Sequence, residues 1–220
     1  MSILNNGRLR SVSAASLTDA LGRLVDHRAH VLDLVSPTPG RVLFGQAVTI
    51  RFVPFRSDLF DESRHSFARH FYDAVPAQPS RTVLVLDSSG HPDVSVGGGT
   101  KFSRLQNLGL AGLVTDARLR DFDELMHYEP VFYCRGETVR AGTEALMPIA
   151  ANVPVSLDGT TVVPGDYIYA DHSGTVVIPA GLLDQVLDVA AGIETQDRAF
   201  LAEIRHEDPE QVRSTGSREG

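Results

Sequence analysis

The stretch from Thr82 to Tyr133 constrains the fold most strongly, because short apolar runs alternate there with loops and helical segments. Thr82–Leu86 and Ala111–Val114 are continuous apolar runs of strand length, and Pro130–Tyr133 is a third. A helical segment from about Thr100 to Leu108 separates the first two runs. Buried strands joined through helices are typical of right-handed crossovers onto a parallel sheet. We therefore predict an α/β fold with a largely parallel sheet in this part of the chain.

The segments before this stretch mix helical and extended patterns. Ser13–Leu24 has its apolar residues on one helical face, with Ser13 or Ser16 available as the N-cap. Arg41–Phe55 is rich in β-branched and aromatic residues and is predicted to be extended. Phe60–Val75 has an amphipathic pattern that predicts one helix.

The segments after it are short strands followed by one long helix. Turns of the Asp-Gly, Pro-Gly and His-Ser-Gly kind separate the predicted strands, which are Val153–Val155, Thr160–Val163, Tyr167–Ala170 and Thr175–Ile178. The helix is predicted from about Pro179 to Ile204. No linker divides the chain, so we predict one domain over residues 1–207, with a polar, frayed tail over 208–220.

Charge and composition narrow the range of partners. The chain has 20 Lys and Arg against 28 Asp and Glu, a net charge of -8. Binding to phosphate backbones needs clustered basic residues, so nucleic acid is not a predicted partner. Cys134 is the single cysteine, which fits a reducing compartment. Neither a signal peptide nor an apolar run long enough for a membrane span is evident, so we expect a cytoplasmic protein.

Three consecutive glycines, Gly97 to Gly99, stand directly before the helix predicted from Thr100. Such a loop can turn several backbone N–H groups toward one point, and the helix N-terminus adds partial positive charge. A carboxylate or phosphate could bind there, with Lys101 adding charge. A plain flexible loop is the alternative. Neither the phosphate-loop pattern nor the dinucleotide fingerprint is present.

The run Thr115–Asp121 follows a predicted buried strand, where α/β proteins place ligand contacts. Arg120 offers a planar fork suited to a carboxylate, and Asp121 offers oxygen to a hard cation such as Mg²⁺. A structural ion pair, with Asp121 capping the next helix, is the alternative, and the residue types leave both open. The eight histidines form no ligand set, so zinc is not predicted.

Within Asn107–Asp121, a Gly-x-x-Gly and an apolar strand lead to Asp116-Ala117-Arg118-Leu119-Arg120-Asp121. Five further motifs, each different from this one, are spread over most of the chain, at Ser16–Gly22, Phe44–Thr49, Val83–Asp87, Val163–Asp171 and Gly174–Pro179. Together these segments resemble the RraA-like family. That family includes regulators of ribonuclease E activity and divalent-metal-dependent 4-hydroxy-4-methyl-2-oxoglutarate aldolases that also decarboxylate oxaloacetate. The resemblance implies a layered α/β/β, swivelling-domain-like single domain with a mixed sheet and a long C-terminal helix.

The resemblance also implies roles for individual residues. Arg120 matches the substrate-binding arginine and Asp121 the metal-binding aspartate, and both are implied to be catalytic. A glutamate on the C-terminal helix of a neighbouring subunit completes the aldolase site, and Glu194 is its match here. The loop residues implied to meet the substrate carboxylate are Gly98, Gly99, Thr100 and Lys101.

Two positions depart from the pattern of the family's aldolases. The acid that usually follows the loop glycine is here Gly99, and the glycine of Asp-Gly-x-x-Arg-Asp is Ala117. A hard, strongly hydrated cation relies on fixed oxygen charge. The resemblance therefore implies Mg²⁺ or Mn²⁺ as the cofactor, bound weakly because position 99 is glycine.

The function that the resemblance implies is carbon–carbon lysis of the aldolase or oxo-acid decarboxylase type. The substrate would be a small 2-oxo carboxylate that reacts through an enolate. One alternative is a non-catalytic regulator that binds a ribonuclease or another protein. Another is a lyase or dehydratase repurposed in a biosynthetic pathway. A homotrimer or hexamer with sites between subunits is also implied.

Overall fold

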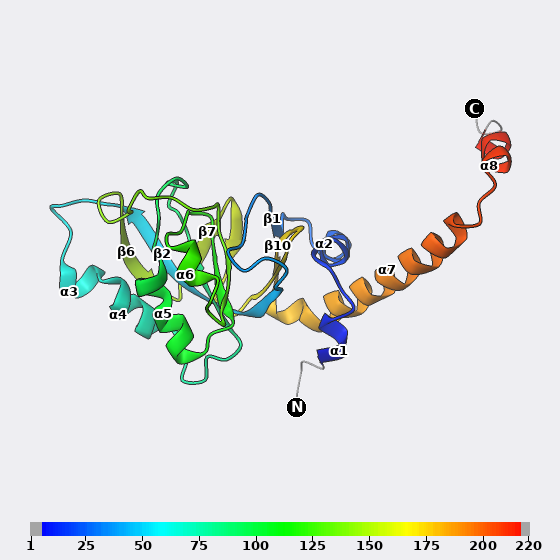
Figure 1. The fold of residues 1–220 in the computed structure, drawn as a ribbon. Helices are drawn as coiled ribbons and strands as arrows, with labels where there is room; N and C mark the ends of the chain where they lie inside the picture. The colour runs from blue at the N-terminus through cyan, green and yellow to red at the C-terminus, as the bar shows by residue number, and fades with distance from the viewer. Residues whose placement is uncertain (1–5, 217–220) are drawn as a thin grey trace.

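A mixed sheet of eight strands organises the chain in the computed structural model, which describes residues 6–216, with side chains described for 7–213 (Figure 1). The strands follow the order β1-β10-β9-β2-β3-β4-β5, and β6 also pairs with β2. Their bounds are β1 His30–Val31, β2 Leu43–Pro54, β3 Thr82–Leu86, β4 Gly112–Thr115, β5 Val131–Tyr133, β6 Leu146–Ala151, β9 Tyr167–Asp171 and β10 Gly174–Ile178. A separate hairpin consists of β7 Val155–Leu157 and β8 Thr160–Val162.

The predicted parallel sheet is confirmed. Strands β2, β3, β4 and β5 run parallel, with Val48 beside Leu84, Leu84 beside Leu113 and Leu113 beside Phe132. Every residue of β3 and β4 is buried, as expected for strands covered on both faces. The carboxyl ends of β3 and β4 therefore lie at one edge of the sheet, and the loops that follow them meet there.

Strand β2 connects the parallel and antiparallel parts of the sheet. Its first residues pair antiparallel with β9, and its residues from Ile50 onward pair antiparallel with β6, with a shift of register between Arg51 and Phe52. The sequence analysis did not predict β6 because Pro148 interrupts its apolar run. Proline lacks the N–H of a central strand but is tolerated at an edge, and β6 pairs only with β2 among the described residues.

The helices and the hairpin cover opposite sides of the sheet. Helix bounds are α1 Asn6–Leu9, α2 Ala14–Gly22, α3 Glu62–His65, α4 Phe67–Ala74, α5 Gly99–Leu108, α6 Phe122–Leu125, α7 Leu183–Ile204 and α8 Pro209–Gly216. Leu84 and Leu86 pack in the core with α4 and α5, whereas Val83 and Val85 pack in the core with the β7–β8 hairpin. A third core joins α2 and α7 to β9 and β10. The predicted layered, mixed-sheet fold is confirmed.

The helix predicted over Phe60–Val75 is wrong as a single element. Ser66 has an extended backbone, with φ -75° and ψ 138°, and separates α3 from α4. Its hydroxyl accepts a hydrogen bond from the Arg69 N–H, so the serine ends one helix and caps the next. The prediction of Ser13 as the cap of α2 is confirmed, because its side chain accepts from the Ser16 N–H.

Helix α7 is the long C-terminal helix that was expected, and its second half projects away from the body of the molecule (Figure 1). Where the sequence analysis expects a frayed tail from residue 208, the structure has α8, and the tail's last four residues lie outside the described part. No helix in residues 6–216 combines the length and the apolar character that crossing a membrane requires.

Candidate active site

The glycine loop and the Arg120 loop lie side by side and are held together by backbone hydrogen bonds. The Arg118 N–H donates to the Val94 carbonyl and the Val96 N–H donates to the Arg118 carbonyl, each at 3.1 Å. The Arg120 N–H then donates to the Gly97 carbonyl at 2.9 Å. The loops after β3 and β4 therefore converge, and the structure brings together the two motifs that the sequence analysis singled out.

Glycine is required where these loops touch. A Cβ atom on Gly98 would overlap Asp121 Oδ2 and lie 2.9 Å from the Arg120 Cβ. The Gly98 backbone is extended, so the restriction comes from the close approach and not from a left-handed conformation. A larger residue at this position would separate the loop from Arg120 and Asp121.

Arg120 is exposed, and within residues 6–216 no hydrogen bond or ion pair engages its guanidinium group. The alternative in which Arg120 forms a structural ion pair with Asp121 is therefore not what the described residues show. An unpaired guanidinium retains its full capacity to bind a carboxylate in a bidentate manner.

Asp121 has φ 61° and ψ 47°, a left-handed conformation that is uncommon for a residue with a side chain. It occupies the N-cap position of α6, but its side chain makes no capping hydrogen bond to that helix. Oδ2 instead accepts from the Gly99 N–H at 3.1 Å. Backbone strain of this kind concentrates at functional sites. The strained backbone directs the carboxylate at the glycine loop.

The first turn of α5 leaves the N–H groups of Thr100 and Lys101 without intrahelical partners, and no described residue accepts from them. The Lys101 side chain is largely buried. Its ammonium group donates to the Val96 carbonyl at 2.7 Å and lies 4.9 Å from the centre of the Phe67 ring. Burial lowers the pKa of Lys101 to about 8. Near neutral pH this lysine carries most of a positive charge that it can lose in mildly alkaline solution.

A pocket of about 470 Å³ collects these groups. Gly97, Gly98, Thr100, Lys101, Arg120 and Asp121 all line it. Apolar side chains from β2, the region around α3 and α4, and β6 also line it, namely Phe52, Phe60, Phe67, Leu146 and Pro148. The pocket therefore combines charged side chains with apolar surface.

The structure does not bring Glu194 to Asp121 within one chain. Glu194 lies on α7, and its carboxylate accepts a hydrogen bond from the Ser13 hydroxyl at 2.8 Å. Among the described residues, no group of three or more His, Cys, Asp or Glu side chains could hold a metal ion. The predicted metal role of Glu194 therefore requires a neighbouring subunit and stays a prediction.

Sequence reasoning missed Glu124, which lies three residues after Asp121 on α6. A Cβ atom on Gly99 would overlap the Glu124 carboxylate, so that carboxylate fills the place where a side chain at position 99 would begin. The Tyr128 hydroxyl lies 2.6 Å from Glu124 Oε1, and this contact raises the pKa of Tyr128 to about 12. Two carboxylates thus meet at Gly99. Oxygen ligands from one or two carboxylates, completed by water, suit Mg²⁺ or Mn²⁺.

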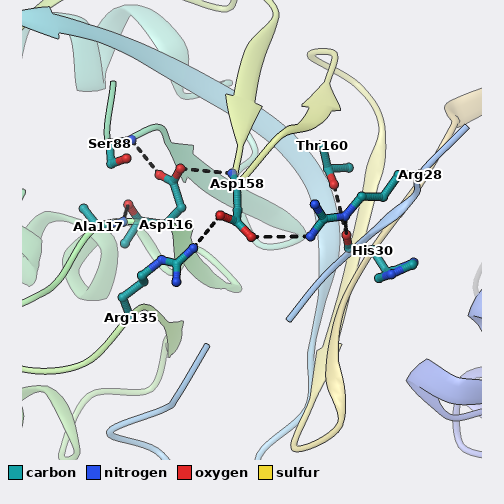
Figure 2. A network of polar contacts seen from close by, with 9 residues as sticks. Arg28, His30, Ser88, Asp116, Ala117, Arg135, Asp158 and Thr160 are labelled. Carbon is teal, nitrogen blue, oxygen red and sulfur yellow. Dashed lines mark hydrogen bonds and ion pairs between the residues drawn. The ribbon is translucent and has the colours of Figure 1, made fainter. Parts of the chain in front are cut away.

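Asp116 lies on the same loop and has a different environment (Figure 2). Its two oxygens accept from the Ser88 N–H at 2.5 Å and the Asp158 N–H at 3.0 Å. Asp158 in turn forms ion pairs with Arg135 and Arg28. Burial raises the pKa of Asp116. The run Thr115–Asp121 therefore divides into a structural half around Asp116 and an accessible half at Arg120 and Asp121.

Comparison with known proteins identifies the family. The model of the RraA-like family, described as Aldolase/RraA, matches residues 14–177. The chain belongs to the RraA-like family. The glycine loop, Arg120, Asp121 and Glu124 all lie within the residues that the RraA-like model matches.

Two relatives illustrate the similarity to known sequences. A protein of Halalkalibacterium halodurans, provisionally named 4-hydroxy-4-methyl-2-oxoglutarate aldolase, is 32% identical over 58% of this chain. Protein DlpA of Legionella pneumophila is 25% identical over 89% of this chain. The chain spans 59% of the first relative's length and 31% of the second's.

Solved structures agree with the fold. An uncharacterised protein from Pseudomonas syringae superposes with a TM-score of 0.77 at 28% identity, covering 96% of this chain and 95% of that one. Streptomyces coelicolor RraAS2, described as an unusual member of the RNase ES inhibitor RraA protein family, superposes with a TM-score of 0.75 at 26% identity. That comparison covers 90% of this chain and 96% of RraAS2. The RraA-like family therefore contains both proteins named as aldolases and RraA-type regulators.

Proposed function

We propose that this chain is a divalent-metal-dependent carbon–carbon lyase, of the aldolase or oxo-acid decarboxylase type, that acts on a 2-oxo carboxylate in the cytoplasm. One observation carries the proposal: the unpaired guanidinium group of Arg120 and the free N–H groups at the start of α5 line the same pocket. Donors arranged in this way suit a carboxylate and an oxygen that gains negative charge next to it.

Each residue has a distinct task in this proposal. Arg120 binds the substrate carboxylate, and the Thr100 and Lys101 N–H groups donate to oxygens at the reacting end. The Lys101 ammonium group adds positive charge from below the loop. A divalent cation, when bound, supplies a Lewis acid that polarises the 2-oxo group. Asp121 is the residue that would hold this cation, and Gly98 keeps it beside the loop.

The pocket, of about 470 Å³, is larger than a three-carbon acid requires, and apolar side chains form part of its lining. Substrates for testing should therefore extend beyond oxaloacetate and 4-hydroxy-4-methyl-2-oxoglutarate to 4-hydroxy-2-oxo acids with aliphatic and aromatic substituents. Purified protein with Mg²⁺ or Mn²⁺ should release pyruvate from at least one member of the panel, as measured by coupled reduction of the pyruvate. The absence of pyruvate release across the whole panel would contradict the proposal.

Replacing Arg120 tests the residue that carries the proposal. Arg120→Met should lower kcat/KM by about a hundredfold or more, because it removes a charged donor from the reacting end of the substrate. Arg23→Met, which removes an exposed arginine at the C-cap of α2, is the matched control and should retain activity. Equal activity of the two variants would exclude Arg120 from the reaction.

The site as proposed is completed across subunits. In a homotrimer, or in a hexamer built from two trimers, Glu194 of one subunit would reach Asp121 of the next. Light scattering on the purified protein tests the assembly. A monomer that still releases pyruvate would remove Glu194 from the site.

A second candidate function is an RraA-type regulator that binds a ribonuclease. The likeness to RraAS2 and the net charge of -8 favour it, because an acidic surface complements a basic partner. The tagged protein should then retain a ribonuclease from the source cell's lysate, as identified by mass spectrometry, and should reduce that enzyme's activity when both are purified. Failure of both assays would exclude this candidate.

A further inference from the structure

The carboxylate of Glu124 is one of two that converge on the glycine loop. Asp121 reaches the loop through the Gly99 N–H, and Glu124 occupies the space beside the Gly99 Cα. The two acids are three residues apart, at the N-cap and the third position of α6, a spacing that places both on one side of a helical turn. Asp121 ends the loop after β4 and Glu124 lies in the short helix that follows it, so one local segment carries both acids.

Glu124 is oriented at one oxygen and free at the other. The Tyr128 hydroxyl lies one turn further along, 2.6 Å from Glu124 Oε1 and 3.1 Å from the Gly99 carbonyl oxygen. No described residue donates to Oε2. A carboxylate held by one hydrogen bond with its second oxygen open is the arrangement that ligands of metal ions adopt, because the outer partner fixes the orientation.

Both acids line a second pocket of about 640 Å³, which shares Arg120 and Asp121 with the first. Glu137 also lines this pocket, but one of its oxygens already accepts from the Phe122 N–H at 2.9 Å. The uncommitted carboxylate oxygens here include Asp121 Oδ1 and Glu124 Oε2. Arg120 stands between this acidic pocket and the one that contains Lys101.

We infer that Glu124 is the second carboxylate that retains the divalent cation, together with Asp121, so that an acid from α6 takes the place of a side chain at position 99. The inference rests on the metal dependence in the proposed function. It also explains the glycine: a side chain at position 99 and the Glu124 carboxylate cannot occupy the same space. The weak metal binding that Gly99 implied is thereby revised, because the missing charge is supplied from another element.

Direct measurement of Mn²⁺ binding tests this role without any assay of activity. Free Mn²⁺ is measured by electron paramagnetic resonance during titration of the purified protein. Glu124→Gln keeps an acceptor for Tyr128 and removes the charge, and it should raise the Kd for Mn²⁺ about tenfold or more. Glu129→Gln, which neutralises an exposed acid five residues further along, should leave the Kd unchanged. Equal melting temperatures without metal would show that all three proteins fold alike.

An exchange of the acid between the two elements gives a second test. Glu124→Ala should lose Mn²⁺ affinity, and the double variant Gly99→Asp with Glu124→Ala should recover most of it. Gly99→Asp alone should melt at a lower temperature than the wild type, because both carboxylates then compete for one place. Lack of recovery in the double variant, with wild-type folding, would argue against a shared place.

The outcomes separate this inference from the proposed function. Wild-type protein that binds no Mn²⁺, or a Glu124→Gln variant that binds it as tightly as the wild type, overturns the inference, even if oxo acids are cleaved. Binding of Mn²⁺ that depends on Glu124, without release of pyruvate from any substrate, supports the inference and contradicts the lyase.

Discussion

Asp116 and Asp121 lie on the same loop after β4, yet their surroundings differ in almost every respect. Asp116 is 7% exposed, and both of its oxygens accept backbone N–H groups from distant segments. Asp121 is exposed, has a left-handed backbone and accepts a single N–H group. Asp116 connects the loop after β3 to the β7–β8 hairpin, whereas Asp121 retains an oxygen for a ligand.

The difference shows how one loop can combine a buried structural anchor with an accessible carboxylate. A buried carboxylate is tolerated only when hydrogen bonds compensate for the loss of water. Asp116 meets that condition and anchors the start of the loop. The anchored segment then holds Asp121 and its strained backbone in place at the other end, since strain persists only where the surrounding structure enforces it.

Removing Asp116 is expected to have the largest effect on the free energy of unfolding, and this effect tests the contrast between Asp116 and Asp121. Asp116→Ala leaves the N–H groups of Ser88 and Asp158 without acceptors and should lower the free energy of unfolding by about 3 kcal/mol. Asp121→Ala removes an exposed side chain and leaves one N–H group, that of the buried Gly99, without its acceptor, against two such groups for Asp116→Ala. It should therefore lower the free energy of unfolding by less than Asp116→Ala does, by about 1 kcal/mol. Urea denaturation of the two variants beside the wild type measures both values.

If Asp121→Ala proved the less stable variant, the structural role would belong to Asp121 and not to Asp116. Mn²⁺ titration of the same proteins adds an independent readout. Asp121→Ala should lose metal binding, while any folded fraction of Asp116→Ala should retain it.

A smaller effect is expected at Lys101, on the affinity of the accessible part of the site for an anion. The pKa of Lys101 is about 8, so the protonated fraction falls about tenfold between pH 7 and pH 9. If Lys101 adds charge to the pocket, the wild type's affinity for oxalate, measured by calorimetry at fixed Mg²⁺, should fall by up to tenfold over these two units. Lys101→Met should bind oxalate more weakly at pH 7 and show a nearly flat profile.

A wild-type profile as flat as that of Lys101→Met would show that the ammonium group does not act on the ligand.

The sequence predicted the part of the site that depends on local order. Gly98 lies in the loop after β3, Arg120 and Asp121 lie in the loop after β4, and the carboxyl ends of neighbouring parallel strands must meet at one edge. Glu124 was missed because its carboxylate occupies the space that the absent side chain of Gly99 leaves open. The spacing of residues along the chain does not reveal that contact. The signal that was present, Asp121 and Glu124 followed by Tyr128 at helical spacing, lies on a helix of only four residues.

The fold was predictable to a similar extent, and for similar reasons. Strands with continuous apolar runs, such as β3, could be located because their burial on both faces is written in their composition. Strand β6 and the break at Ser66 could not, because each depends on one residue whose local preference is decided by its neighbours in space. The predicted metal role of Glu194 requires a second subunit, which no property of one chain specifies.

The smallest effect is expected at Asp87, which follows β3 and belongs to the structural half. Asp87 is 6% exposed, and its Oδ1 accepts from the Phe52 N–H at 3.0 Å. Burial, together with the charge of Asp116, raises its pKa from 3.8 to about 6. The unfolded chain therefore releases this proton at a lower pH than the native protein does, so this carboxyl makes the protein less stable as pH rises from about 4 to 6.

Asp87→Asn keeps the acceptor for Phe52 and cannot ionise. It should raise the free energy of unfolding by about 1 kcal/mol at pH 7.5, and the gain should shrink toward pH 4, as measured by urea denaturation across that range. The value is small because Asp87 and Asp116 line a pocket of about 580 Å³ with Arg51 and Arg135, where water and positive charge moderate the repulsion. An asparagine variant less stable than the wild type at pH 7.5 would mean that the ionised Asp87 carboxylate is itself stabilised in the native protein, for example by Arg51 or Arg135. Asp87 would then not belong with the buried carboxylates whose charge destabilises the fold.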